Sequence, residues 1–110
     1  MTITRIKPGP RMSQAVVHGG TVYTAGQIAD DSSQDVAGQT HQILAKIDGL
    51  LAEAGTDKSK LLKATIWLSD ISTFSEMNSI WDAWVDQGNT PVRACVESKL
   101  AMPELTVEIM

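Results

Sequence analysis

The sequence predicts an α+β fold in which a single mixed β-sheet carries two helices packed on one face. Segments near both ends of the chain alternate apolar and polar residues, which is typical of strands, and two central segments repeat apolar residues at helical spacing. Two amphipathic helices can cover only one face of such a sheet. We therefore expect the other face of the sheet to be covered by something other than these two helices.

The composition indicates a single soluble domain spanning residues 1–110. Hydrophobic residues make up 43% and charged residues 20% of the chain, and no apolar run approaches the length of roughly 20 residues that a membrane span needs. The one cysteine cannot form an intrachain disulfide, and the N-terminus lacks a signal-peptide pattern. We expect a cytoplasmic protein with no membrane partner.

The net charge disfavours a nucleic-acid partner. The chain carries 9 basic and 13 acidic residues, for a formal charge of −4. Nucleic-acid binding draws much of its free energy from lysines and arginines that neutralise phosphates. We expect no nucleic acid among the partners.

The N-terminal quarter predicts three strands. Residues 3–6 are consistent with a short edge strand, and 14–18 with 21–25 form a hairpin around Gly19-Gly20, a dipeptide suited to a tight primed turn.

Two amphipathic helices follow. Asp35 is a suitable N-cap for the first, and Gly55 is suitably placed to end it. Thr73 and Glu76 have the spacing of a capping box at the start of the second, which Gly88 would end. The apolar positions of the two helices are Val36, Ile43, Leu44, Ile47, Leu50, Leu51 and Ala54, then Phe74, Met77, Ile80, Trp81 and Trp84.

Three more strands complete the sheet, with 61–68 at its centre and 91–97 and 105–109 at the end of the chain. Alternation divides the last two strands into an apolar and a polar face. The apolar face would hold Val92, Ala94, Val96, Leu105, Val107 and Ile109, and the polar face Arg93, Cys95, Glu97, Thr106 and Glu108.

Arg93 is the main candidate functional residue. Its guanidinium is always charged, presents a planar fork of donors that fits a carboxylate, and is costly to bury unpaired. One interpretation is a structural salt bridge to Glu97 or Glu108, either within the sheet or across a subunit interface, and the other is an anionic ligand. Pattern alone leaves both open.

The sheet face left free by the helices is expected to carry Tyr23, Ala25, Trp67, Arg93 and Cys95. This set is too mixed for a dry core and too apolar for open water. We infer that other subunits cover it, and that a ring of identical chains would leave clefts between neighbours in which Arg93 finds a ligand.

The sequence lacks the residues that several kinds of binding site and active site require. His18 and His41 have no partners at ligand spacing, so no metal is expected. There is no glycine-rich phosphate loop and no nucleophile elbow. Cys95 could be a nucleophile if a cation lowered its pKa, but a lone strand cysteine is more often an inert small hydrophobe.

Four stretches together resemble the RidA/YjgF family of reactive imine deaminases. They are residues 24–28 (TAGQI), 74–78 (FSEMN), 91–97 (PVRACVE), and Pro103 with 107–109 (VEI). The resemblance covers nearly the whole chain. It implies a fold similar to chorismate mutase, assembled as a homotrimer with a central barrel and three clefts between subunits.

The resemblance also implies an activity. The family hydrolyses enamines and imines such as 2-aminoacrylate and 2-iminopropanoate to a 2-keto acid and ammonia, without a cofactor. By position, Arg93 would hold the substrate carboxylate, and Glu108 with the main chain at Cys95 would position the attacking water. Asn78 and the Gly26 segment would line the cleft.

Two cleft positions depart from better-known members. Met12 stands where they have a tyrosine, and Ala25 where they have a serine. Both are expected to contact substrate, without the hydroxyls of those relatives.

Two other functions are possible for such a chain. A non-catalytic protein could use the same Arg93 cleft to bind a keto acid or another small carboxylate. A ribonuclease activity, attributed to some relatives, is opposed by the acidic charge.

Overall fold

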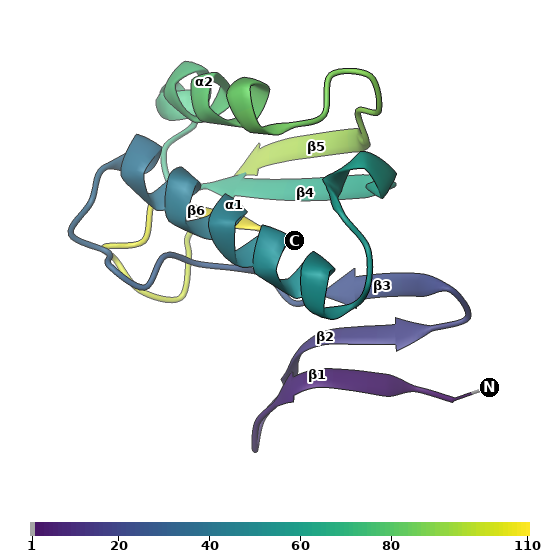
Figure 1. The fold of residues 1–110 in the computed structure, drawn as a ribbon. Coiled ribbons are helices and arrows are strands. Elements are labelled where there is room, and N and C mark those ends of the chain that lie inside the picture. Colours follow the sequence, from purple (N-terminus) through teal and green to yellow (C-terminus); the bar gives the residue numbers. More distant parts are fainter. Residues whose placement is uncertain (1) are drawn as a thin grey trace.

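The computed structural model describes residues 2–110 and contains six strands, two α-helices and two short 3-10 helices. The elements run β1 (Thr4–Pro8), β2 (Ser13–His18), β3 (Thr21–Thr24), α1 (Val36–Glu53), η1 (Lys58–Lys60), β4 (Lys63–Leu68), η2 (Ile71–Thr73), α2 (Phe74–Trp84), β5 (Val92–Glu97) and β6 (Val107–Ile109). This is the α+β class that the sequence predicts (Figure 1).

The strands form two three-stranded sheets where the sequence predicted one. The first has the order β1-β2-β3 and is antiparallel throughout. The second has the order β5-β4-β6 and is mixed, because β4 pairs parallel with β5 and antiparallel with β6. A bridge between Gln27 and Ile109 joins the two sheets. The prediction of six strands was therefore right, and the prediction that they form one continuous sheet was wrong.

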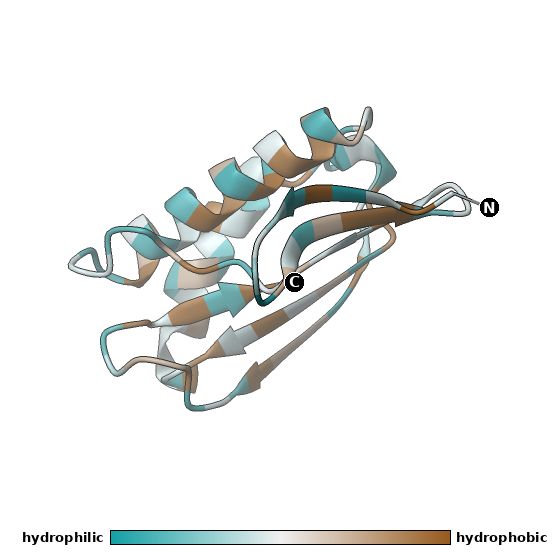
Figure 2. Cartoon of the chain, turned by 90° about the horizontal axis from the view of Figure 1, so that it is seen from below, coloured by the Kyte–Doolittle hydropathy of each residue, from teal (hydrophilic) through white to brown (hydrophobic). Residues whose placement is uncertain are grey.

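Both helices pack on the same side of the strands (Figure 2). The main core unites apolar side chains from α1, α2, β4 and β6, including Ile43, Leu44, Ile66, Met77 and Ile109. A smaller cluster of Ile6, Ala15 and Leu50 holds the first sheet against α1.

Most predicted turn and cap residues of the N-terminal half take their expected roles. Gly19 and Gly20 both have positive φ, as a primed hairpin turn requires. The Asp35 side chain accepts a hydrogen bond from the Gly38 N–H at 2.9 Å, and Gly55 follows α1 in the left-handed region with φ 82°.

The start and end of α2 differ from the prediction. Thr73 makes no side-chain cap, because its hydroxyl donates to the Asp70 carbonyl within η2. The helix ends at Trp84, where Val85 already has extended backbone, so Gly88 lies beyond it. Leu61 and Leu105 also lie outside the strands predicted to contain them.

The register of β4 corrects the predicted faces of the C-terminal strands. Residues paired across a ladder share a face. Arg93 and Cys95 pair with the buried Ala64 and Ile66, so they lie on the helix side of the sheet. Glu108 pairs with Trp67 and lies on the other side.

Two parts of the expected arrangement were therefore wrong. The polar residues of the last two strands do not share a face, and Arg93 and Cys95 are not on the face that the helices leave free. Alternation within a strand fixes which residues share a side, but not which side faces the helices. Val92, Ala94 and Val96 are on the free face, where no element of the protomer covers them.

The free face exposes an apolar surface. Val92 is 68%, Tyr23 59% and Val96 47% exposed, and Trp67 is half-buried on the same side. Grouped apolar residues of this kind mark interaction surfaces on soluble proteins.

The helices of residues 2–110 are all too short or too polar to cross a bilayer. The same residues contain no group of three or more His, Cys, Asp or Glu side chains arranged to hold a metal ion.

The middle of α1 offers a test of the helix assignment. A Cβ built on Gly49 meets no atom within 4 Å. Because alanine loses less backbone entropy than glycine in a helix, we expect Gly49→Ala to raise the free energy of unfolding by about 0.5–1 kcal/mol. Urea denaturation monitored by circular dichroism measures it. Gly55→Ala is the matched control and should destabilise, because Gly55 has φ 82°; a destabilised Gly49→Ala would contradict the assignment.

Candidate functional site on two faces of one sheet

Arg93 lies on edge strand β5 and is held by aromatic rings of α2. Its Cζ is 5.7 Å from the Phe74 ring centroid and 5.4 Å from the Trp81 ring centroid. Phe74 and Trp81 are seven residues apart, so they project from the same side of the helix. Cation–π attraction to two rings fixes the guanidinium without occupying its hydrogen-bond donors.

Neither predicted internal carboxylate neutralises Arg93. Glu97 accepts a hydrogen bond from the Ile71 N–H at 3.0 Å, and Glu108 lies across the sheet. The one ion pair within residues 2–110 joins Lys46 to Asp30, so Arg93 takes part in none there. The interpretation of Arg93 as half of an internal salt bridge is therefore wrong for the protomer.

Asn78 adds an unsatisfied polar atom on the same side of α2. It lies one helical turn after Phe74 and just before Trp81, the two residues whose rings hold Arg93. Its Oδ1 is buried and has no hydrogen-bond partner among residues 2–110. A buried unpaired oxygen costs about 1–3 kcal/mol, so this position favours a partner from outside the protomer.

Cys95 follows Arg93 on the same side of β5 and packs against the main core. Burial raises the pKa of its thiol, and the nearby Arg93 charge opposes this only in part. The protonated thiol therefore predominates at neutral pH, and a thiol is a poor nucleophile. This argues for the inert interpretation of Cys95.

Glu108 forms a second group on the opposite side of the sheet. It projects from β6 beside Gly26, and a Cβ built on Gly26 would collide with its carboxylate. A side chain at position 26 would therefore require the Glu108 side chain to shift. The neighbouring bridge from Gln27 to Ile109 holds the two segments together, with backbone hydrogen bonds of 2.7 and 3.1 Å.

Ala25 precedes Gly26 in the chain, and Met12 lies two residues before Gln14, to which Ala25 is hydrogen-bonded. The Ala25 N–H donates to the Gln14 carbonyl at 2.8 Å, which ties the residue to the start of β2. Met12 is in the turn that precedes β2, and its side chain is 45% exposed.

The predicted site residues thus form two half-sites. The first, with Arg93, Cys95 and Asn78, lies on the helix side; the second, with Gly26 and Glu108, lies on the free side of the sheet. The structure does not bring the two half-sites together within one chain.

Sequence reasoning missed the two rings that hold Arg93, because Phe74 and Trp81 were assigned only to the apolar stripe of the helix. The spacing of Phe74, Asn78 and Trp81 was the available signal. These residues occupy one side of α2, so a cation facing that side would meet aromatic rings.

The fold and the divided site define a class of small α+β proteins with a half-buried arginine on an edge strand. The family model described as Endoribonuclease L-PSP matches residues 2–110. A RutC family protein from Haemophilus ducreyi is 44% identical over 108 residues, which is 98% of this chain and 92% of that protein. The chain therefore belongs to this family, which also carries the names YjgF and Rid.

Solved structures have the same fold. A YjgF family protein from Neisseria meningitidis is 46% identical, with a TM-score of 0.96 over 99% of this chain and 91% of that one. A Rid family protein of unknown function from Yersinia pestis is 36% identical, with a TM-score of 0.82 over 92% of this chain and 84% of that one.

Alkylation of Cys95 tests the chemical state of its thiol. Because burial raises the pKa of the thiol, we expect iodoacetamide at pH 8 to react more slowly with the folded protein than with the protein unfolded in urea. The pKa of the thiol is lower in the unfolded chain than in the folded protein, so the unfolded chain loses this proton first. The free energy of unfolding is therefore expected to fall as the pH rises from the pKa of the unfolded chain to the pKa of the folded protein. Mass spectrometry measures the rate in both samples. Faster alkylation of the folded protein would instead indicate an activated thiolate.

Proposed function

We propose that this protein hydrolyses reactive imines and enamines of the 2-iminopropanoate type to a 2-keto acid and ammonia. The observation that carries the proposal is the Arg93 guanidinium, which is held by two aromatic rings and has no carboxylate partner among residues 2–110. Membership of the family supports it.

The first step is binding of the substrate carboxylate. The fork of Arg93 donates two parallel hydrogen bonds to the two carboxylate oxygens, which fixes the plane of the substrate. The rings of Phe74 and Trp81 limit the movement of the guanidinium. Asn78 supplies a buried oxygen that can accept a hydrogen bond from the imine nitrogen.

The second step is addition of water to the C=N carbon. Glu108 accepts a hydrogen bond from the water and orients its oxygen toward that carbon. A C–O bond forms as the π electrons move to nitrogen, and one proton of the attacking water passes to that nitrogen. The C–N bond then breaks as the hydroxyl oxygen forms the C=O bond, and the remaining hydroxyl proton leaves with the nitrogen as ammonia. An iminium carbon is already electrophilic, so orientation of the water matters more than strong activation.

We further propose that the site is composite and forms between protomers of a homotrimer. The two half-sites are on opposite sides of one sheet, so the Arg93 group of one chain can meet only the Glu108 group of another. The exposed valines and Tyr23 on the free face support burial against other copies.

The alternative is a non-catalytic protein that binds a keto acid in the same cleft. Binding of a keto acid would require only the Arg93 group, whereas hydrolysis also uses the Glu108 carboxylate beside Gly26 to orient water. The family description also carries an endoribonuclease activity, but the formal charge of −4 disfavours RNA.

Arg93→Ala tests the carboxylate clamp. A dehydratase that generates 2-aminoacrylate is coupled to the purified protein, and pyruvate release is timed. Loss of the bidentate pair is expected to reduce the acceleration by about a hundredfold or more.

Lys99→Ala is the control, because it removes a positive charge from an exposed loop residue. It should retain full activity. If the native protein gives no acceleration but binds pyruvate, the keto-acid alternative is correct; full activity of Arg93→Ala would remove that residue from the mechanism.

Complementation tests the composite site. Arg93→Ala and Glu108→Gln should each be inactive alone. When equal amounts are unfolded together and refolded, each cleft takes one half-site from each neighbour, so about a quarter of the clefts regain both intact groups. Recovery of about a quarter of the native activity is expected in the pyruvate assay, and no recovery above either variant alone would place both groups in one chain.

A further inference from the structure

A pocket of about 410 Å³ lies between α1 and the first sheet; it contains no residue of either half-site, although Gln27 in its lining follows Gly26 in the chain. Its lining residues are Lys7, Gln14, Gln27, Ala45, Lys46, Gly49 and Leu50, and we call it the Lys7 pocket. Gly49 leaves open space on the helix side, because a Cβ there would touch nothing within 4 Å.

Lys7 reaches this pocket through an unusual backbone conformation. Its φ is 48°, and it is the only residue other than glycine with positive φ in residues 2–110. The ladder pairs Ile6 with Ala15 and Pro8 with Ser13, so Lys7 lies opposite Gln14. Ile6 faces α1, and in a regular strand Lys7 would point away from that helix.

The left-handed conformation at Lys7 is costly for two reasons. Residues with a Cβ disfavour it, and a residue that precedes a proline favours extended backbone. Strain of this kind persists where the surrounding structure imposes it, and it is concentrated at functional sites. At Lys7 it turns a cationic side chain toward the pocket.

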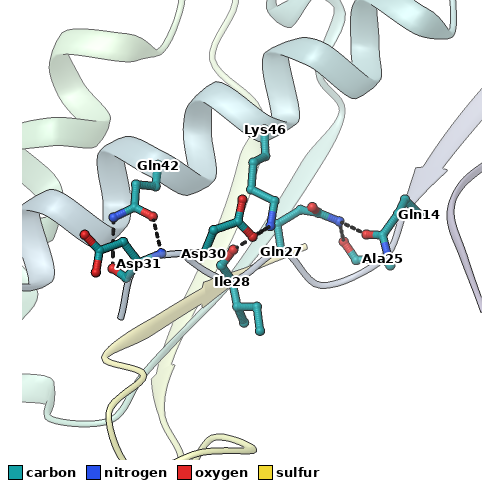
Figure 3. A network of polar contacts seen from close by, with 8 residues as sticks. All are labelled: Gln14, Ala25, Gln27, Ile28, Asp30, Asp31, Gln42 and Lys46. Carbon is teal, nitrogen blue, oxygen red and sulfur yellow. Dashed lines mark hydrogen bonds and ion pairs between the residues drawn. The ribbon is translucent and has the colours of Figure 1, made fainter. Parts of the chain in front are cut away.

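The orientation of the two carboxamides in the pocket follows from a backbone carbonyl (Figure 3). Gln27 Nε2 donates to the Ala25 carbonyl at 3.1 Å, and because a carbonyl can only accept, this contact fixes the side-chain amide. The same Nε2 donates to Gln14 Oε1 at 3.0 Å, and the Nε2 donors of Gln14 have no acceptor among residues 2–110.

Lys46 contributes a further donor. Its Nζ donates to the Ile28 carbonyl at 2.9 Å and to Asp30 Oδ1 at 3.0 Å (Figure 3), so one of its three N–H groups remains. Within residues 2–110, the Lys7 ammonium makes no ion pair. The pocket therefore has unused donors on Lys7, Gln14 and Lys46 among residues 2–110, and one positive charge without an ion-pair partner, that of Lys7, because Lys46 is paired with Asp30.

We propose that the Lys7 pocket binds a small oxyanion, either a carboxylate or a phosphate group. Such a group has only acceptors, matches the free donors of Lys7, Gln14 and Lys46, and offsets the positive charge. This site is independent of the Arg93 half-site and does not depend on the imine chemistry.

The test is a titration of the intact protein followed by amide chemical shifts in ¹⁵N-labelled samples. Inorganic phosphate and succinate are added separately, with sodium chloride at equal ionic strength as the reference. We expect saturable shifts at Gln14, Gln27 and Gly49 with at least one of the two anions, and the effective anion identifies the group. Shifts that do not saturate with either anion, or that chloride reproduces, would overturn the proposal.

Two substitutions test the role of the lysine. Lys7→Gln should weaken binding by about tenfold or more, because it removes a charge-assisted hydrogen bond. Lys60→Gln, at an exposed position outside the pocket, makes the same change of net charge and should bind as the native protein does.

Lys7→Gly separates binding from folding. Glycine tolerates positive φ, so this variant should retain the native melting temperature while losing affinity as Lys7→Gln does. Native affinity in both Lys7 variants, or an equal loss in Lys60→Gln, would show that the anion does not bind at Lys7.

Discussion

The register of β4 against its two neighbours is the constraint on which the candidate site depends. One strand pairs with both β5 and β6, and its alternation sends Arg93 to the helix side and Glu108 to the free side. A slip of β6 by one residue would move Glu108 to the helix side, but it would turn Val107 and Ile109 out of the core. Since each such side chain contributes about 1.5–3 kcal/mol by burial, the hydrophobic core maintains the separation of the two groups.

The surroundings of Arg93 suit orientation better than covalent chemistry. Two aromatic rings hold the guanidinium from the side of α2, and the adjacent Cys95 thiol is kept protonated by burial. A fixed guanidinium next to a protonated thiol can bind a carboxylate without forming a covalent bond to the ligand.

Local features of the fold could be predicted from the sequence, because each depends on a few neighbouring residues. The glycine pair of the hairpin, the Asp35 cap and the stop at Gly55 all follow from short-range geometry. The faces of the last strands could not be predicted, because alternation does not say which side meets the helices. Here Val92 and Val96 do not join the core of their own chain, so hydrophobicity gave the wrong side. The rings around Arg93 were missed for a related reason, since a stripe of apolar residues on a helix does not reveal a cation that packs against it.

The bridge between Gln27 and Ile109 has a consequence for the surroundings of Glu108. It joins the two sheets through two backbone hydrogen bonds, and the Gln27 side chain is tied to Gln14 on the N-terminal hairpin. Gly26, the preceding residue, lies against the Glu108 carboxylate. The position of the Gly26 backbone beside the Glu108 carboxylate is therefore set by contacts to both sheets, so the packing around this group includes the N-terminal hairpin as well as the strand that carries it.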